Sequence, residues 1–321
     1  MVAKVVAVTG CLGFLGTHVL HRLMAHDIRV YGFDAETYAA NQEWLAWYRS
    51  SPTRSTDCFK YQRADVCTLE HLPDVDAIIH LAAETHVDRS VLDAATFVRT
   101  NVLGTQHLLD LACGKRQYQM PLFLHVSTDE VYGSVADGST PETAPLAPSS
   151  PYAASKAAAD HLVMAYGHTY GLPWRMVRPS NCYGTRQYPE KLIPKAIRCL
   201  TLGKPIPIHE GGLATRSWLD VDDCAEAILT VLERGATGEI YNVGGNTERS
   251  VRDVATLVIE AFHGPTPEPA QYLDLGFTRL GLDQRYHVDD TKLRALGWIP
   301  AGNLDRDVPV LVETERRVFR W

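Results

Sequence analysis

The sequence predicts an α/β fold in which a doubly wound parallel sheet carries a smaller mixed α/β lobe. Apolar, β-prone runs alternate with helical patterns up to about residue 175, which is typical of a parallel sheet built from strand–helix–strand units. Beyond that point the pattern loosens into short strands, turns and helices. We therefore expect residues 1–175 to form the sheet domain, with later segments interleaved, and residues 176–321 to form most of the smaller lobe.

Composition narrows the class of protein. The chain has 321 residues, of which 45% are apolar and 21% charged, as in ordinary globular proteins, and its net charge of −7 argues against a nucleic-acid-binding surface. Seven scattered cysteines without a Cys-x-x-Cys pair indicate neither a disulfide framework nor a zinc site. No apolar run approaches the roughly 20 residues that span a bilayer, and the start of the chain does not resemble a signal peptide. We expect a cytoplasmic protein without a metal or membrane partner.

The first strand, residues 4–9, leads into a turn with glycines at positions 10, 13 and 16, and a helix is expected over residues 17–25. Such a turn allows close backbone approach to a pyrophosphate at the helix N-terminus. The strand–turn–helix context favours a Rossmann-type dinucleotide site. The turn residues expected to bind the cofactor are Gly10, Gly13, Phe14, Leu15 and Gly16.

The next three strands add polar or small residues at their carboxyl ends. Strand 28–33 ends at Asp34, which is placed either to bind a ribose 2′-hydroxyl, favouring NAD over NADP, or to cap the loop. Residues 35–57 look less regular. Strand 59–63 precedes Asp65 and Val66, which either reach an adenine edge or cap the loop, and strand 76–81 is followed by small residues that let a cofactor lie against the backbone. These last contacts are expected at Leu81, Ala82 and Ala83.

Strand 122–126 opens into Ser127–Gly133. Because ligands lie at the carboxyl ends of parallel strands, Thr128, Asp129 and Glu130 are expected to project into a cleft. Two adjacent carboxyl groups there can work as an acid and a base if their environments separate their pKa values.

A helix beginning near residue 151 carries Tyr152 and Lys156, which are four apart and share one face. A lysine ammonium beside a phenol favours the phenolate, which could take a proton from a sugar hydroxyl while a hydride leaves the same carbon. The alternative for this pattern alone is an ordinary pair on a surface helix. A helix over residues 96–113 contains Asn101, either bonded to the site backbone or facing solvent.

The second half is expected to close over a substrate. Strands are predicted at 174–177, 206–209 and 240–243, and helices at 221–234 and 251–263.

Taken together, the glycine turn and Tyr152-x-x-x-Lys156 resemble the extended short-chain dehydrogenase/reductase superfamily. Within it, Thr37–Asn41, His80–Ser90, Ser127–Gly133 and Tyr188–Pro194 resemble the nucleotide-sugar 4,6-dehydratases that act on dTDP-glucose or UDP-glucose. The resemblance covers almost the whole chain, and Thr128-Asp129-Glu130 is its most specific part.

This resemblance implies NAD-dependent conversion of a nucleotide-linked glucose to the 4-keto-6-deoxy sugar, with NAD regenerated and tightly held. Tyr152, assisted by Lys156 and Thr128, is implied as the base for oxidation at C4. Glu130 is implied to remove the C5 proton and Asp129 to protonate the departing C6 hydroxyl. A homodimer is also implied.

The implied substrate contacts are Thr85, Asn181, Glu190, Lys191, Arg216 and Arg279. The chain departs from the family at Cys182 and Thr185, and at Leu280 and Leu282, where relatives often carry Pro and His. The segment 283–293 resembles plant-type UDP-glucose dehydratases more than the bacterial dTDP-glucose enzymes. The alternatives are a UDP-sugar 4-epimerase or decarboxylase on the same scaffold, or a non-catalytic NAD-binding sensor.

Overall fold

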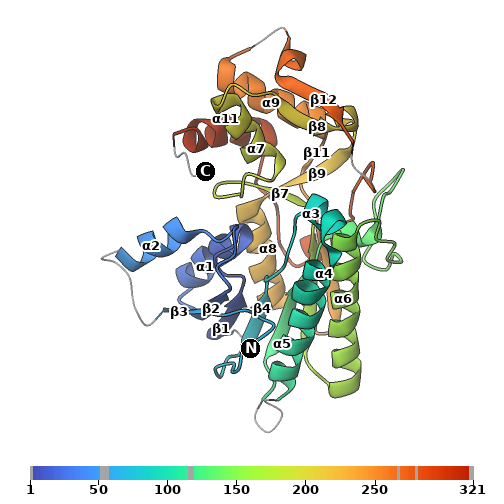
Figure 1. The fold of residues 1–321 in the computed structure, drawn as a ribbon. Coiled ribbons are helices and arrows are strands. Elements are labelled where there is room, and N and C mark those ends of the chain that lie inside the picture. The colour runs from blue at the N-terminus through green and yellow to red at the C-terminus, as the bar shows by residue number, and fades with distance from the viewer. Residues whose placement is uncertain (1–2, 51–57, 115–118, 266–267, 279–280, 318–321) are drawn as a thin grey trace.

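The computed structural model describes residues 3–50, 58–114, 119–265, 268–278 and 281–317, and its centre is a seven-stranded parallel sheet (Figure 1). The strands in spatial order are β10 (Glu239–Val243), β6 (Trp174–Pro179), β5 (Leu122–Val126), β4 (Ala77–His80), β1 (Val5–Thr9), β2 (Arg29–Asp34) and β3 (Phe59–Arg63). The order of the strands reverses between β1 and β4. In an open α/β sheet, a ligand crevice forms at the carboxyl ends of the strands at such a point.

Helices cover both faces of this sheet, which explains why its central strands are apolar throughout. Figure 1 shows α1 (Phe14–Ala25) and α8 (Val221–Arg234) together on one side, and α5 (Gly104–Cys113) and α6 (Pro151–Tyr170) on the other. Successive β1 residues point to opposite faces, so Val6 and Val8 belong to the core under α1 and α8, whereas Ala7 packs with residues of α5 and α6.

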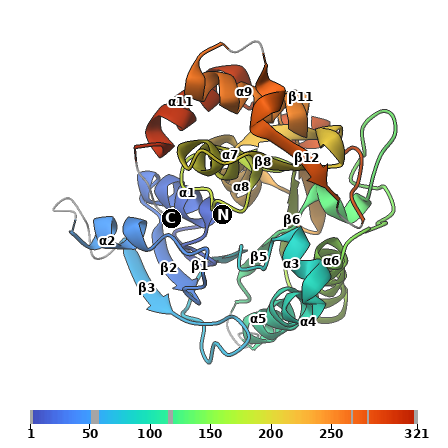
Figure 2. The same cartoon turned by 45° about the horizontal axis from the view of Figure 1, so that its top comes forward.

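The smaller lobe stands over the carboxyl edge of the sheet (Figures 1 and 2). Its strands are β7 (Asn181–Tyr183), β9 (Thr215–Asp220) and β11 (Thr247–Ser250) in one sheet, with β8 (Ile206–His209) and β12 (Leu273–Phe277) as a pair. Its main helices are α7 (Leu192–Thr201), α9 (Val251–His263) and α11 (Leu304–Glu315), which enclose a core of their own. Because β10 lies between β9 and β11 in the chain, the polypeptide passes from the lobe to the large sheet and back.

Several boundaries agree with the sequence predictions, including those of β3, β5, β8, α8 and α9. Helix α1 begins three residues early, because Gly13 rather than a later residue is its N-cap. The segment expected to be irregular contains α2 (Gln42–Ser50), whose Trp44 and Tyr48 pack on Phe59.

The helix expected over 96–113 is broken into pieces: α4 (Ala94–Phe97), a π-helical turn (Val98–Leu103) and α5. Neither α7 nor α11 was predicted. The remaining short elements are α3 (Val87–Leu92), α10 (Thr291–Arg294) and the 3-10 helices Asp129–Tyr132, Glu210–Gly212 and Pro269–Tyr272.

Candidate active site

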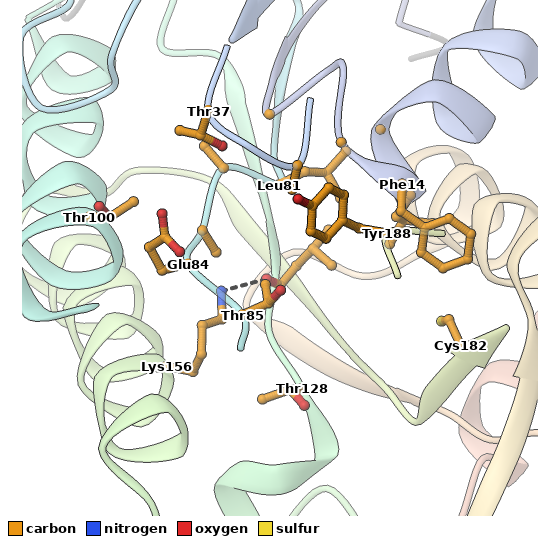
Figure 3. A pocket seen from close by; sticks show the side chains of 18 of the residues that line it. Phe14, Thr37, Leu81, Glu84, Thr85, Thr100, Thr128, Lys156, Cys182 and Tyr188 are labelled. Atoms are coloured by element: carbon orange, nitrogen blue, oxygen red, sulfur yellow. Dashed lines mark hydrogen bonds between the residues drawn. The ribbon is translucent and has the colours of Figure 1, made fainter. Parts of the chain in front are cut away.

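A cavity opens at the carboxyl ends of the parallel strands, between the large sheet and the lobe (Figure 3). It is lined by every residue predicted to bind the cofactor, a set to which Tyr152 and Lys156 also belong in addition to their expected role as base and partner: Gly10, Gly13, Phe14, Leu15, Gly16, Asp34, Asp65, Val66, Leu81, Ala82, Ala83, Tyr152 and Lys156. Thr128, Asp129 and Glu130 line the same cavity, as do Thr85, Asn181, Glu190 and Lys191. The fold thus gathers residues as far apart in the chain as Gly10 and Lys191.

The glycine turn has the close packing that its spacing predicted. Gly10 has φ +67°, and a Cβ there would lie 2.7 Å from the backbone nitrogen of Ala82. A Cβ on Gly16 would lie 2.2 Å from the carbonyl oxygen of Gly10, so α1 can approach the turn only without a side chain there. Gly13, the N-cap of α1, has no side chain to occupy the first-turn N–H groups. The turn therefore fits a pyrophosphate at this helix N-terminus.

Of the two roles that the sequence left open for Asp34, the structure confirms the loop cap. Its carboxylate accepts hydrogen bonds from the backbone N–H groups of Leu12 (2.9 Å) and Glu36 (2.8 Å), which fixes the glycine turn against β2. The same side chain lines the cavity, and burial raises its pKa. A carboxylate held in this way retains lone pairs for ribose hydroxyls.

The two adjacent carboxyl groups begin a 3-10 helix capped by Thr128, whose hydroxyl accepts a hydrogen bond from the Glu130 N–H (3.3 Å). Asp129 is 2% exposed, and among the described residues no group hydrogen-bonds its Oδ2. Burial, assisted by the neighbouring Glu130 charge, raises the pKa of Asp129 to about 8. Asp129 is therefore a protonated acid at neutral pH.

Tyr152 and Lys156 are both buried on the inner face of α6. The Lys156 ammonium donates to the carbonyl oxygen of Val126 at 2.8 Å, which anchors it below the cavity. Burial lowers the pKa of Lys156 to about 8, against the opposing effect of Asp160. Burial and the Glu130 charge raise the pKa of Tyr152, whereas a hydrogen bond from Thr128 lowers it.

The π-helical turn positions Asn101 beside this site. Its amide oxygen accepts from the Glu84 N–H (2.8 Å), and its Nδ2 donates to the Glu84 carbonyl (3.0 Å) and to the Ser155 hydroxyl (2.8 Å). Of the two readings of Asn101, the bond to the backbone of the site is confirmed. The asparagine ties the loop after β4 to the helix that carries Tyr152.

The residues predicted near the sugar meet where the loop after β4 faces the lobe. Lys191 donates to the Thr85 carbonyl at 2.8 Å. The buried Glu190 carboxylate lies 3.8 Å from His86 Nε2 and 3.9 Å from the guanidinium of Arg89, and burial raises its pKa. This contact joins the two parts of the molecule across the cavity.

A second cavity continues from the first into the lobe and shares Glu130, Asn181, Glu190 and Lys191 with it. Its cations are Lys191, Lys195 and Arg216, and its aromatic walls include Trp218 and Tyr286. Cations followed by apolar walls suit a diphosphate and a base. The sequence did not lead us to predict Lys195, Trp218 or Tyr286 at the site. The spacing of four between Lys191 and Lys195 was an available signal, whereas no local pattern pointed to Trp218 or Tyr286.

Arg216 is held by the backbone around it. Its guanidinium donates to the carbonyl oxygens of Thr215 (2.8 Å) and Asp283 (2.9 Å), and lies 4.4 Å from the ring centre of Tyr286. Arg279 lies outside the residues that the structure describes.

Three further observations concern the described residues. They contain no group of three or more His, Cys, Asp or Glu side chains arranged to hold a metal ion. None of their helices is long and apolar enough to cross a membrane. All seven cysteines are free thiols.

Comparison with known proteins gives consistent matches over the whole chain. The family model described as GDP-mannose 4,6 dehydratase matches residues 7–308. The dTDP-glucose 4,6-dehydratase of Streptomyces griseus is 43% identical, with 98% of this chain and 94% of the relative covered. A trifunctional UDP-glucose 4,6-dehydratase/epimerase/reductase of Arabidopsis thaliana is 39% identical over 99% of this chain, which spans 47% of that protein.

Solved structures agree with these matches. The dTDP-glucose 4,6-dehydratase of Streptomyces venezuelae, crystallised with NAD and TYD bound, superposes with a TM-score of 0.90 at 37% identity, covering 98% of each chain. UDP-glucuronic acid 4-epimerase of Bacillus cereus, in complex with UDP-glucuronic acid and NAD, superposes with a TM-score of 0.89 at 26% identity. It covers 98% of this chain and 100% of the epimerase.

Proposed function

The chain belongs to the GDP-mannose 4,6-dehydratase family, and from this premise we propose that it converts UDP-glucose or dTDP-glucose to the 4-keto-6-deoxy sugar. It is an NAD-dependent nucleotide-sugar 4,6-dehydratase, a lyase that eliminates one water. The roles of individual residues below are part of the proposal.

NAD would lie along the first cavity, with its pyrophosphate at the glycine turn, a ribose at Asp34, and further contacts from Asp65, Val66 and Leu81–Ala83. When bound, it supplies the hydride acceptor for oxidation at C4 and the hydride donor for reduction at C6. No arginine follows Asp34 directly to receive a 2′-phosphate, which supports NAD rather than NADP.

For the oxidation step, Tyr152 takes the proton of the sugar C4 hydroxyl. Its phenol needs help to ionise, because burial and Glu130 both raise its pKa. The Lys156 ammonium, buried on the same face of α6, stabilises the phenolate, and the Thr128 hydroxyl supports it by hydrogen bonding.

For the elimination step, the ketone at C4 acidifies the C5 proton, Glu130 removes it, and Asp129 protonates the departing C6 hydroxyl. The observation that carries the proposal is the pair itself: a buried, protonated Asp129 beside Glu130, in one cavity with Tyr152. An acid and a base side by side match an elimination that needs both.

The substrate would pass from the first cavity into the second. Glu190, Lys191 and Thr85 stand at the junction, where the sugar and its phosphate belong. Asn181 and Arg216 would meet the diphosphate, since a guanidinium offers paired donors to phosphate oxygens. Arg279 is proposed near the nucleotide by family resemblance alone.

Mass spectrometry with an equal mixture of UDP-glucose and dTDP-glucose, without added NAD, tests this function. Loss of one water from either donor would support both the reaction and a retained cofactor, and the faster donor would identify the preferred nucleotide. If neither donor lost water even with added NAD, the proposed function would be wrong.

A UDP-sugar 4-epimerase or decarboxylase is the second candidate, because epimerases share the fold at 26% identity. Asp129 argues against it, because the family resemblance implies a small residue at this position in the related epimerases and decarboxylases. A non-catalytic sensor has no use for Tyr152, Lys156, Asp129 and Glu130 together.

We also propose a homodimer formed by the layer α3 to α6. The layer exposes apolar side chains, with Leu92 87% and Leu103 53% exposed. Leu92→Glu should shift the molecular mass in analytical ultracentrifugation from dimer to monomer, and an unchanged dimer would contradict this interface.

Free thiols fit the reducing cytoplasm, which we propose as the location.

A further inference from the structure

Residues 283–289, the bridging segment, connect the catalytic part of the molecule to the strand that carries Arg216. On one side the segment pairs with the loop 134–140, which follows the 3-10 helix of Asp129 and Glu130. Val135 N–H donates to the Arg285 carbonyl (3.0 Å), and Thr140 N–H donates to the His287 carbonyl (2.9 Å). The Ser134 hydroxyl accepts from the N–H groups of residues 284 and 285.

On its other side the bridging segment pairs with β9. Thr215 N–H donates to the Gln284 carbonyl (2.7 Å), and Tyr286 N–H donates to the Thr215 carbonyl (3.3 Å). The segment also supplies the Asp283 carbonyl and the Tyr286 ring that hold the Arg216 guanidinium. The position of Arg216 relative to Asp129 and Glu130 therefore depends on where this segment lies.

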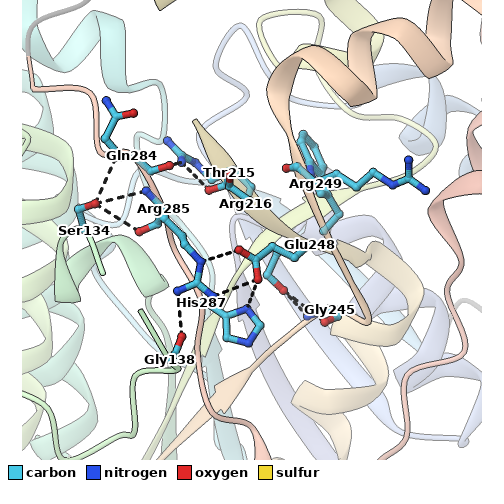
Figure 4. A network of polar contacts seen from close by, with 12 residues as sticks. Ser134, Gly138, Thr215, Arg216, Gly245, Glu248, Arg249, Gln284, Arg285 and His287 are labelled. Atoms are coloured by element: carbon cyan, nitrogen blue, oxygen red, sulfur yellow. Dashed lines mark hydrogen bonds and ion pairs between the residues drawn. The ribbon is translucent and has the colours of Figure 1, made fainter. Parts of the chain in front are cut away.

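One ion pair fixes the segment to the lobe (Figure 4). Arg285 Nε and NH2 lie 2.5 and 3.0 Å from the two carboxylate oxygens of Glu248 on β11, while NH1 donates to the Gly138 carbonyl (2.9 Å). His287 Nδ1 lies 3.2 Å from the same carboxylate. One arginine side chain thus joins β11, the bridging segment and the loop 134–140.

We propose that Glu248 and Arg285 are positioning residues that set Arg216 for the substrate diphosphate by locking the bridging segment between the loop 134–140 and β9. This inference rests on the proposed function, because it assumes that Arg216 meets the diphosphate. Neither residue lines either cavity, so each acts through Arg216 rather than by touching substrate.

The geometry favours positioning over stability as the role of this pair. The side chains of Arg285 and Glu248 are 22% and 30% exposed, so solvent screens part of their attraction and limits its contribution to the folding free energy. A two-point arginine–carboxylate pair does, however, fix the orientation and register of the two segments that it joins. Loss of this pair should therefore weaken diphosphate binding, with little change in the melting temperature.

The test is charge reversal with rescue, read out as binding rather than turnover. Calorimetric titration with UDP and with dTDP gives Kd for each protein. Arg285→Glu and Glu248→Arg should each raise Kd about tenfold, the ratio that corresponds to 1.4 kcal/mol. The double variant restores the ion pair in reverse order but not the hydrogen bond to the Gly138 carbonyl, so it should bind more tightly than either single variant without reaching the wild-type Kd. In turnover, KM for the nucleotide sugar should rise more than kcat falls.

The matched control lies one residue further along the same strand. Arg249 forms an ion pair with Asp305 of α11, in which one guanidinium nitrogen donates to both carboxylate oxygens (2.9 and 2.7 Å), and its side chain points away from the bridging segment in Figure 4. Arg249→Glu should leave Kd unchanged. If a charge-reversal variant does not fold, the neutral Glu248→Gln should still raise Kd about threefold. This loss of affinity is smaller than that expected for charge reversal.

The outcomes separate the two proposals. Wild-type protein that neither binds UDP or dTDP nor removes water from their glucose esters would refute the proposed function. Wild-type binding with unchanged Kd in the single variants, or a double variant that binds no more tightly than either single variant, would refute the positioning role alone.

Discussion

Asp129 and Glu130 are consecutive residues whose side chains lie in different environments: Asp129 is 2% exposed, whereas Glu130 is half-buried and lines both cavities. The negative charge of Glu130 is one cause of the raised pKa of Asp129. The charge of Glu130 thus supports the protonated state that the elimination step needs from Asp129.

Asp129→Asn should slow loss of water by about 100-fold or more, the usual scale for removal of a general acid. Asparagine keeps the size of the side chain but cannot supply the proton. Rapid-quench mass spectrometry of substrate and product measures the rate, and the NAD content of the purified variant controls for an intact cofactor site. Elimination at the wild-type rate would show that another group is the acid.

Glu130→Gln should strongly slow proton removal at C5 while leaving C4 oxidation possible. In deuterated water the variant should therefore accumulate the NADH absorbance, and exchange of the C5 hydrogen should be about 100-fold slower than in wild type. Proton NMR of the sugar measures that exchange. Exchange that continues at the wild-type rate would assign the base elsewhere.

Turnover should fall as the pH rises through about 8. The active form requires a protonated Asp129 and a charged Lys156. Burial raises the pKa of Asp129 to about 8 and lowers the pKa of Lys156 to about 8. Both groups lose their proton in the same direction, so the losses reinforce each other on the alkaline side. A profile of kcat that stays flat to pH 10 would contradict these protonation states.

A buried ion pair below the site should matter for stability. Arg178 (1% exposed) donates to Asp160 (fully buried) through Nε and NH2, at 3.0 and 2.9 Å. Arg178→Met alone leaves a buried carboxylate without its cation, and should lower the free energy of unfolding by about 3–5 kcal/mol. Chemical denaturation measures the loss.

The matched double variant, Arg178→Met with Asp160→Asn, removes both charges and should recover part of that loss. A double variant less stable than either single variant would contradict this expectation. It would show that the ion pair stabilises the fold by more than each charge's offset of the cost of burying the other.

Local patterns predicted the large sheet and the place in it of the proposed catalytic residues, which line one cavity. Buried apolar strands and the glycine turn have short-range signals, and Thr128–Glu130 and Tyr152 with Lys156 each follow directly from an element that was recognised. Helix α2 was not predicted, because residues that break helices surround it, although Trp44, Trp47 and Tyr48 have helical spacing.

The second cavity was only partly predictable, for a physical reason. Arg216 was implied by family resemblance, but its support comes from Asp283 and Tyr286, about 70 residues away in sequence. The pairing of Glu248 with Arg285 depends on how three separate segments meet. No local periodicity encodes such contacts, because they arise only when the lobe has packed.

The most direct test of the central claim follows the hydrogen at C4 of the sugar. With substrate deuterated at both C4 and C5 in ordinary water, the account predicts a product that has lost one water, carries the C4 deuterium at C6 and has a solvent hydrogen in place of the deuterium at C5. Mass spectrometry and proton NMR of the product locate both. Deuterium that remains at C4, in a sugar of unchanged mass and inverted configuration, would contradict the account and identify an epimerase.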